Sequence, residues 1–100
     1  MPRIQGLTEL YLTNSQQVKS EEGYVFSVTI AFTGVTAGQR CYLRDGSGGA
    51  ATIEVPFSFP TANGVITKEW PQGKHFASGI YWDAGPGDNP DNVFIELTYK

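Results

Sequence analysis

One stretch constrains the fold of this chain more than any other: residues 24–33, which read YVFSVTIAFT. Apolar side chains occupy every second position of this stretch, namely Tyr24, Phe26, Val28, Ile30 and Phe32. The positions between them carry small or hydroxylated residues, apart from one valine. A period of two places alternate side chains on opposite faces of an extended strand. We therefore expect a central β-strand with one apolar face against the core and a wetter face opposite.

The rest of the chain repeats this alternation in shorter segments. Further strands are predicted at residues 7–13, 18–19, 39–45, 51–59, 65–70, 76–83 and 93–99. Turn signals rich in Gly, Pro, Asn and Asp separate them about every 8–12 residues, and no segment shows a helical period. The sequence therefore predicts an all-β fold, a single antiparallel β-sandwich of about seven or eight strands, of jelly-roll or immunoglobulin-like kind.

The strand predicted at residues 51–59 carries a proline. Pro56 has no amide hydrogen to donate to a β-ladder, so this strand is expected at a sheet edge or with a bulge. The alternation places Ile53, Val55 and Phe57 on one face and Pro56 on the other.

The length and the charge of the chain limit the class of protein to which it can belong. One hundred residues predict one domain over residues 1–100, with residues 1–6 as a flexible arm. The chain has 40% hydrophobic and 17% charged residues, which is typical of a globular protein. Its net charge is −3 and its seven Lys and Arg residues are scattered, which argues against nucleic-acid binding. The sequence shows no apolar run suited to a signal peptide or a membrane span, so we expect synthesis in a cytoplasm and no membrane partner.

The composition also argues against catalysis. Cys41 is the only cysteine and His75 the only histidine, which disfavours a zinc site and most nucleophilic mechanisms. Cys41 shares a strand face with Leu43, whereas Arg40 and Arg44 fall on the opposite face. A reactive thiol needs basic neighbours on its own face, so we expect a buried and inert one. We therefore expect no enzyme activity and no cofactor.

The loop at residues 83–92, DAGPGDNPDN, is the longest stretch without a strand pattern. Its three carboxylates and two side-chain amides offer the hard oxygen ligands that calcium prefers. It lacks the EF-hand spacing, and the same composition is ordinary for a solvated loop. We therefore favour contact with a partner through Asp88 and Asn89, with calcium binding as the alternative.

Aromatic side chains are the other candidates for contact with a partner. Large aromatic residues dominate both protein cores and subunit interfaces, and an exposed flat set of them suits stacking on sugar rings. The predicted partner-binding residues are Tyr42, Trp70, Tyr81, Trp82, Asp88, Asn89 and Phe94. Tyr11 is a further candidate for contact between subunits.

Three segments carry a resemblance to a known class of proteins. They are RCYLRDG at residues 40–46, FASGIYW at residues 76–82 and the final strand, which ends in Tyr99. Together they resemble small β-sandwich proteins encoded among the structural genes of tailed bacteriophages, over about residues 24–100. The resemblance implies a non-enzymatic virion component, either a capsid decoration (cement) protein or a neck or tail part. It carries no catalytic residue to this chain.

Two hypotheses of different class follow. In the first, the chain is a structural protein of the virion, made in the host cytoplasm, that binds copies of itself or a capsid or tail protein. In the second, it is a carbohydrate-binding or host-attachment module that binds a glycan through exposed aromatic residues. An apolar patch that fits a protein surface favours the first, and a flat aromatic patch flanked by polar groups favours the second.

Overall fold

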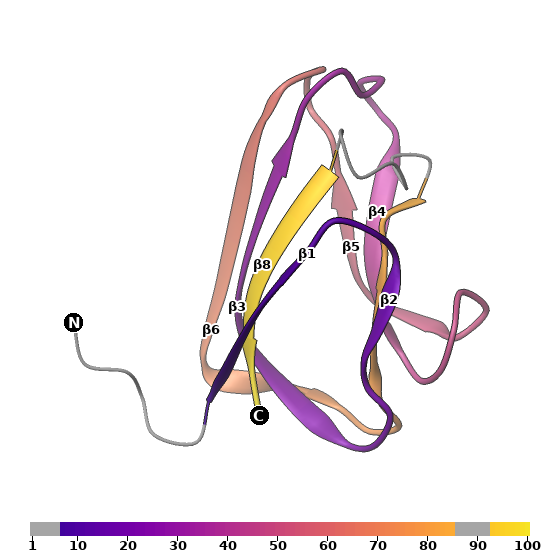
Figure 1. Cartoon of the computed structure of the whole chain (residues 1–100), viewed down its shortest axis with the longest axis vertical. Helices are drawn as coiled ribbons and strands as arrows, with labels where there is room; N and C mark the ends of the chain where they lie inside the picture. The colour runs from indigo at the N-terminus through magenta and orange to yellow at the C-terminus, as the bar shows by residue number, and fades with distance from the viewer. Residues whose placement is uncertain (1–6, 86–92) are drawn as a thin grey trace.

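A computed structural model describes residues 7–85 and 93–100, which form two antiparallel sheets of four strands each (Figure 1). The strands are β1 (Thr8–Leu12), β2 (Gln16–Lys19), β3 (Gly23–Phe32), β4 (Arg40–Asp45), β5 (Thr52–Ser58), β6 (Gly64–Phe76), β7 (Ile80–Asp83) and β8 (Val93–Tyr99). Sheet A has the order β1-β8-β3-β6 and sheet B the order β2-β7-β4-β5. The described residues contain no α-helix, and therefore none that could cross a membrane. The all-β prediction is confirmed, whereas the predicted arm at residues 1–6 lies outside the described residues.

The inward side chains of both sheets form one core. Its fully buried members include Ile30, Ile95 and Leu97 from sheet A and Leu43 and Trp82 from sheet B. The alternation predicted for residues 93–99 is confirmed, since every second residue of β8 from Val93 to Leu97 is fully buried. These apolar faces form because burying one such side chain stabilises the fold by roughly 1.5–3 kcal/mol.

The faces predicted for residues 24–33 are correct only in the second half of β3. Val28 and Ile30 are fully buried, but Tyr24 is 38% exposed and Val25 is fully buried. The cause is a β-bulge: Val25 pairs with Tyr99 and Ser27 with Thr98, so one residue of β3 has no partner in β8. A bulge exchanges the inward and outward positions on its two sides. An unbroken alternation across residues 24–33 is therefore wrong.

Strand β6 is longer than expected. The sequence predicts a strand at residues 65–70 followed by a turn at Pro71–Lys74, but β6 continues to Phe76. Pairing with β3 resumes after an irregularity, with Glu69 opposite Ser27 and Lys74 opposite Val25. Long-range pairing thus overrides a local turn signal, and Phe76 ends this strand instead of opening the next.

The edge predicted from Pro56 is confirmed, because β5 is the outer strand of sheet B and Pro56 is exposed. A second bulge lies beside it. Leu43 pairs with Val55 and Arg44 with Ile53, so Glu54 is the extra residue of β5. This bulge leaves Ile53 45% exposed, which corrects its predicted inward position.

Candidate interaction surface

The outer face of sheet A carries an apolar band that crosses all four strands. Phe94 of β8 lies opposite Ala31 of β3, which in turn lies opposite Val65 of β6. Tyr11 of β1 stacks on Phe94, with ring centroids 6.2 Å apart and an interplanar angle of 12°. Val65 and Tyr11, at the ends of the band, are 64% and 60% exposed, the highest values for large hydrophobic residues in the described ranges. We call Tyr11, Phe94, Ala31 and Val65 the apolar band.

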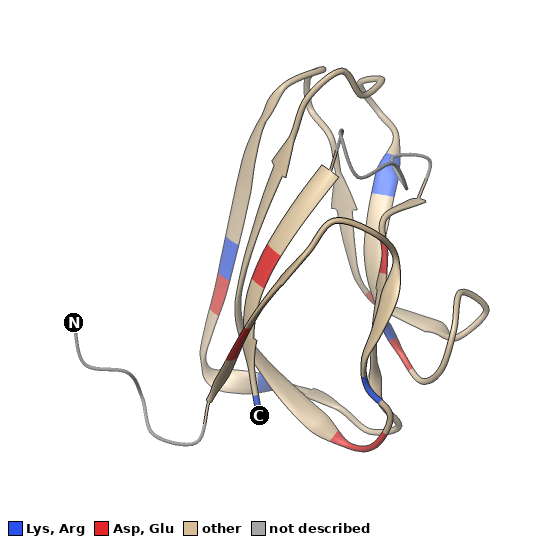
Figure 2. Cartoon of the chain, viewed as in Figure 1, with Lys and Arg blue, Asp and Glu red and all other residues tan. Residues whose placement is uncertain are grey.

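Carboxylates flank the apolar band on the same face. Glu96 lies opposite Tyr11, and Glu9 and Glu69 lie at the two ends of the next outward row, opposite Thr98 and Ser27 respectively. The outward positions of these rows hold no Lys or Arg in the described part of the chain, and Figure 2 shows acidic segments on β1, β8 and β6. The outer face of sheet A therefore carries the apolar band with carboxylates beside it.

The outer face of sheet B holds two of the predicted partner-binding residues, Tyr42 and Tyr81, both half-buried. Arg44 lies opposite Tyr81, and its guanidinium carbon lies 5.0 Å from the centroid of the Tyr42 ring. Arg44 Nε donates to Asp83 Oδ2 at 2.8 Å, and Nη1 donates to the Ala51 carbonyl at 2.7 Å. Because the guanidinium lies over Tyr42, these two tyrosines do not form an open stacking platform.

The other predicted partner-binding residues on described strands do not lie with Tyr42 and Tyr81 on the outer face of sheet B. Trp82 is fully buried on the inward face of β7, so its assignment as a partner contact is wrong. Its inward position follows from its place opposite Leu43 in the register. Trp70 is half-buried and packs against the core from β6. Asp88 and Asn89 lie outside the described residues.

The single cysteine and the acidic side chains were the residues considered for catalysis and metal binding. Cys41 is fully buried, and this burial raises the pKa of its thiol to about 12, with the charge of Asp83 as a second cause. Within the described ranges, no cluster of three or more His, Cys, Asp or Glu could hold a metal ion. In the loop considered for calcium, Asp83 already accepts hydrogen bonds from Arg44 and from the Gly85 amide. Residues 86–92 of that loop lie outside the described residues.

Sequence reasoning included Tyr11 and Phe94 but missed Ala31 and Val65. No local signal links these two residues, because the band exists only when β8, β3 and β6 pair in this register. No protein-family model, curated protein or solved structure matches this chain. Of the two outer faces, that of sheet A is the better candidate for contact with a partner. The apolar band has exposed side chains at both ends, whereas Arg44 on sheet B is already paired with Asp83 and lies over Tyr42.

Proposed function

We propose that this protein is a non-enzymatic structural component of a virus particle, a capsid decoration (cement) protein or a neck or tail part. It binds another protein of the particle through the apolar band. The band carries this proposal, because it brings apolar side chains of all four strands together on one face, with Tyr11 and Val65 exposed and Ala31 and Phe94 half-buried between them. Contiguous exposed apolar surface with a polar rim is typical of protein–protein contact.

The proposed fold is a jelly roll. The strand orders contain the nested pairs β1-β8, β2-β7, β3-β6 and β4-β5, as expected of one long hairpin rolled into two sheets. An immunoglobulin-like sandwich instead places several consecutive strands side by side, whereas among the described strands only β4 and β5 are consecutive neighbours. Jelly rolls with eight strands occur in viral capsid domains and in lectins, so this fold is compatible with the virion and does not exclude glycan binding.

The charges beside the band favour a particular partner. Glu69 and Glu96 favour a surface with an apolar centre and a rim of Lys or Arg, because complementary charges across an interface suppress wrong partners. Two copies that met through this same face would place their carboxylates together. The proposed contact is therefore with a capsid or tail protein, or with a different face of another copy.

The carbohydrate-binding alternative stays a hypothesis. The aromatic residues first considered for it do not gather: Trp82 is buried, and Arg44 lies over the Tyr42 ring. These residues support sugar binding less than the apolar band supports protein contact.

Incorporation into particles tests the proposed function. A tagged chain is expressed in a host that produces the virus, and particles are purified on a density gradient and probed by immunoblot. We expect the unmodified chain in the particle fraction and a Tyr11→Ser, Val65→Ser double variant in the soluble fraction. The matched control, Tyr81→Ser on the outer face of sheet B, should remain with the particles. Absence of the unmodified chain from the particles would overturn the proposal.

A further inference from the structure

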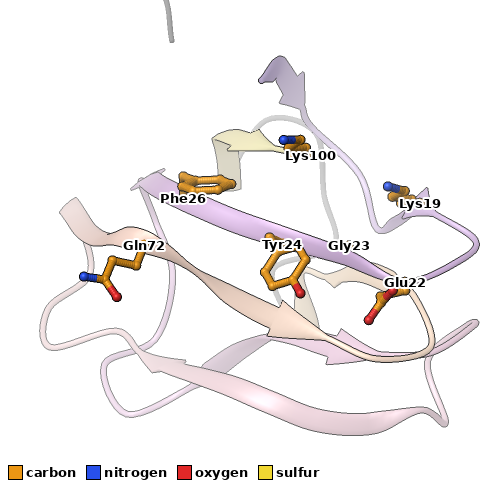
Figure 3. A pocket seen from close by; sticks show the side chains of 7 residues that line it. All are labelled: Lys19, Glu22, Gly23, Tyr24, Phe26, Gln72 and Lys100. Atoms are coloured by element: carbon orange, nitrogen blue, oxygen red, sulfur yellow. The ribbon is translucent and has the colours of Figure 1, made fainter. Parts of the chain in front are cut away.

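An open groove of about 330 Å³ lies beside the first half of β3 (Figure 3). Its lining residues are Lys19, Glu22, Gly23, Tyr24, Phe26, Gln72 and Lys100. The apolar band crosses the same strand at Ala31, five residues beyond Phe26, so the two surfaces are separate. The volume is at the lower end of the roughly 300–1,000 Å³ that small-molecule sites occupy.

The bulges shape this groove. The bulge in β3 turns Tyr24 outward, and in Figure 3 its ring lies in the middle of the lining residues. On the neighbouring strand, residues 70–73 lie opposite Phe26 alone, which brings Gln72 to the rim. Bulges often re-aim side chains next to functional sites. The irregular pairing that breaks the sequence pattern is thus the feature that builds the groove.

Two glycines leave room for the groove side chains. A Cβ at Gly73 would come within 3.0 Å of Phe26 Cζ, and the φ of Gly73 is +88°. A Cβ at Gly23 would come within 2.9 Å of Lys19 Cδ. Any larger residue at either position would displace a side chain that lines the groove.

Tyr24 is held in place from several directions. Its backbone exchanges two hydrogen bonds of 2.9 Å with Lys100. Its ring packs against His75, with centroids 4.9 Å apart, and His75 Nε2 lies 2.5 Å from Glu22 Oε2. A side chain that is already ordered loses little conformational entropy when a ligand binds. The order of Tyr24 therefore favours the binding of even a weak ligand.

The polar rim fits hydroxyl groups. Lys19 and Lys100 only donate hydrogen bonds, Glu22 in its ionised form only accepts them, and the Gln72 amide does both. A hydroxyl group also donates and accepts, so a neutral ligand with several hydroxyl groups can pair with the lysines, the Gln72 amide and the Glu22 carboxylate alike, whereas a wholly apolar ligand would leave the rim unpaired. The flat apolar side of a sugar ring matches the exposed face of an aromatic ring such as Tyr24.

We infer that this groove binds a neutral sugar ring, with Tyr24 as the stacking surface. This inference goes beyond the proposed contact through the apolar band and does not depend on it. It assigns glycan recognition to residues other than the tryptophans and tyrosines that the sequence first suggested.

A titration of the isotope-labelled protein, followed by amide NMR, tests this inference. The probes are glucose, galactose, mannose and N-acetylglucosamine, with glucuronate as the acidic comparison. We expect at least one neutral sugar to bind at millimolar concentration and to shift the amides of Gly23, Tyr24, Phe26 and Gly73. Tyr24→Ala should weaken that binding by about tenfold, the value of one lost aromatic contact.

Controls keep the test decisive. Tyr11→Ala, on the apolar band, should bind the sugar as the unmodified chain does. If Tyr24→Ala fails to give a folded spectrum, Gln72→Ala takes its place, with weaker binding again expected. The inference is overturned by the absence of shifts with every neutral sugar, by stronger binding of glucuronate, by shifts centred on Tyr42 and Tyr81, or by unchanged affinity in the groove variant. None of these outcomes affects the particle test of the apolar band.

Discussion

At the scale of single residues, Cys41 shows how the face of a strand sets chemistry. Its side chain points from β4 into the core and is fully buried, while Arg44 lies on the outer face and pairs with Asp83. Burial disfavours the thiolate, which is the form that reacts. We therefore expect the thiol to be inert in the folded protein at neutral pH. A thiol reagent should label Cys41 only after denaturation, and rapid labelling of the folded protein would contradict this expectation.

The raised pKa of Cys41 also predicts a dependence of stability on pH. The thiol ionises at about pH 8.5 in an unfolded chain and at about pH 12 in the folded one. Between these values the unfolded state binds fewer protons, so the free energy of unfolding falls as the pH rises. The slope from this group is about 1.4 kcal/mol per pH unit, and below about pH 8.5 its contribution is fully present.

Denaturant titrations of the unmodified chain and of Cys41→Ala, from about pH 8 upward, measure this effect. All other titrating groups are common to both proteins, so the unmodified chain should lose stability more steeply. Equal slopes for the two proteins would show that Cys41 is not the group responsible.

Two neighbours in β3 provide a sharp contrast in tolerance to charge. Ile30 is fully buried, so Ile30→Asp should unfold the protein or cost more than about 4 kcal/mol. Thr29 faces outward opposite Glu96, so Thr29→Lys forms a cross-strand pair of opposite charge and should change stability by less than about 1 kcal/mol. Urea unfolding measures both variants. Similar losses would mean that both faces of β3 are buried.

At the scale of elements, the bulge in β3 is the feature with most consequence. It buries Val25 and exposes Tyr24, the reverse of the unbroken alternation. Val25→Asp should therefore cost more than about 3 kcal/mol, whereas Tyr24→Ser should cost about 1 kcal/mol or less. Chemical denaturation compares the two. A larger loss of stability in Tyr24→Ser than in Val25→Asp would mean that the alternation is unbroken and that β3 has no bulge at this position.

The sheet edges carry devices that oppose edge-to-edge pairing. Pro56 interrupts the donors of β5. On β6, Lys68 lies opposite the buried Val28, so a charged residue occupies an inward position of an edge strand yet remains exposed. Lys74 of β6 and Glu54 of β5 lie 3.2 Å apart and link the two edges. Inward charge and proline both protect edge strands from association with other chains.

Removal of the charge on β6 should expose that edge. Lys68→Val replaces the inward charge of this edge strand with a β-branched apolar residue, and we expect aggregation to begin at a lower temperature than in the unmodified chain. Lys68→Arg keeps the charge and serves as the control. Light scattering during heating measures the onset, and an unchanged onset in Lys68→Val would show that the lysine does not protect the edge.

At the scale of the whole molecule, the two outer faces differ in charge. The outer face of sheet A is acidic around the apolar band, whereas that of sheet B carries Arg40 and the paired Arg44. Repulsion between two acidic faces opposes direct self-association through the band, and salt screens such repulsion between exposed charges. The attraction of the exposed apolar side chains does not depend on this screening.

The solution mass should therefore depend on salt. We expect light scattering to show a monomer at low ionic strength and reversible association at high ionic strength. The Tyr11→Ser, Val65→Ser double variant should remain monomeric, while Tyr81→Ser should behave as the unmodified chain. Association that does not depend on the salt concentration, or that the double variant still shows, would mean that the contact between copies lies outside the apolar band.

The sequence by itself determined the features that depend on neighbours along the chain. The alternation in residues 93–99 predicted their buried face, and the strand face that Cys41 shares with Leu43 predicted a buried thiol. Pro56 predicted an edge strand, because a missing amide hydrogen is a property of one residue. These predictions hold because a period of two is a local consequence of the extended backbone.

Only the tertiary structure decided the features that depend on partner strands. The pairing of β8 with β1 and β3 brings Phe94 beside Tyr11 and Ala31, although these residues are far apart in the chain. The same long-range pairing places the bulges, turns Tyr24 toward the groove and puts Trp82 in the core. One extra residue in a ladder reverses every following side chain, and the ladder is set by the partner strand.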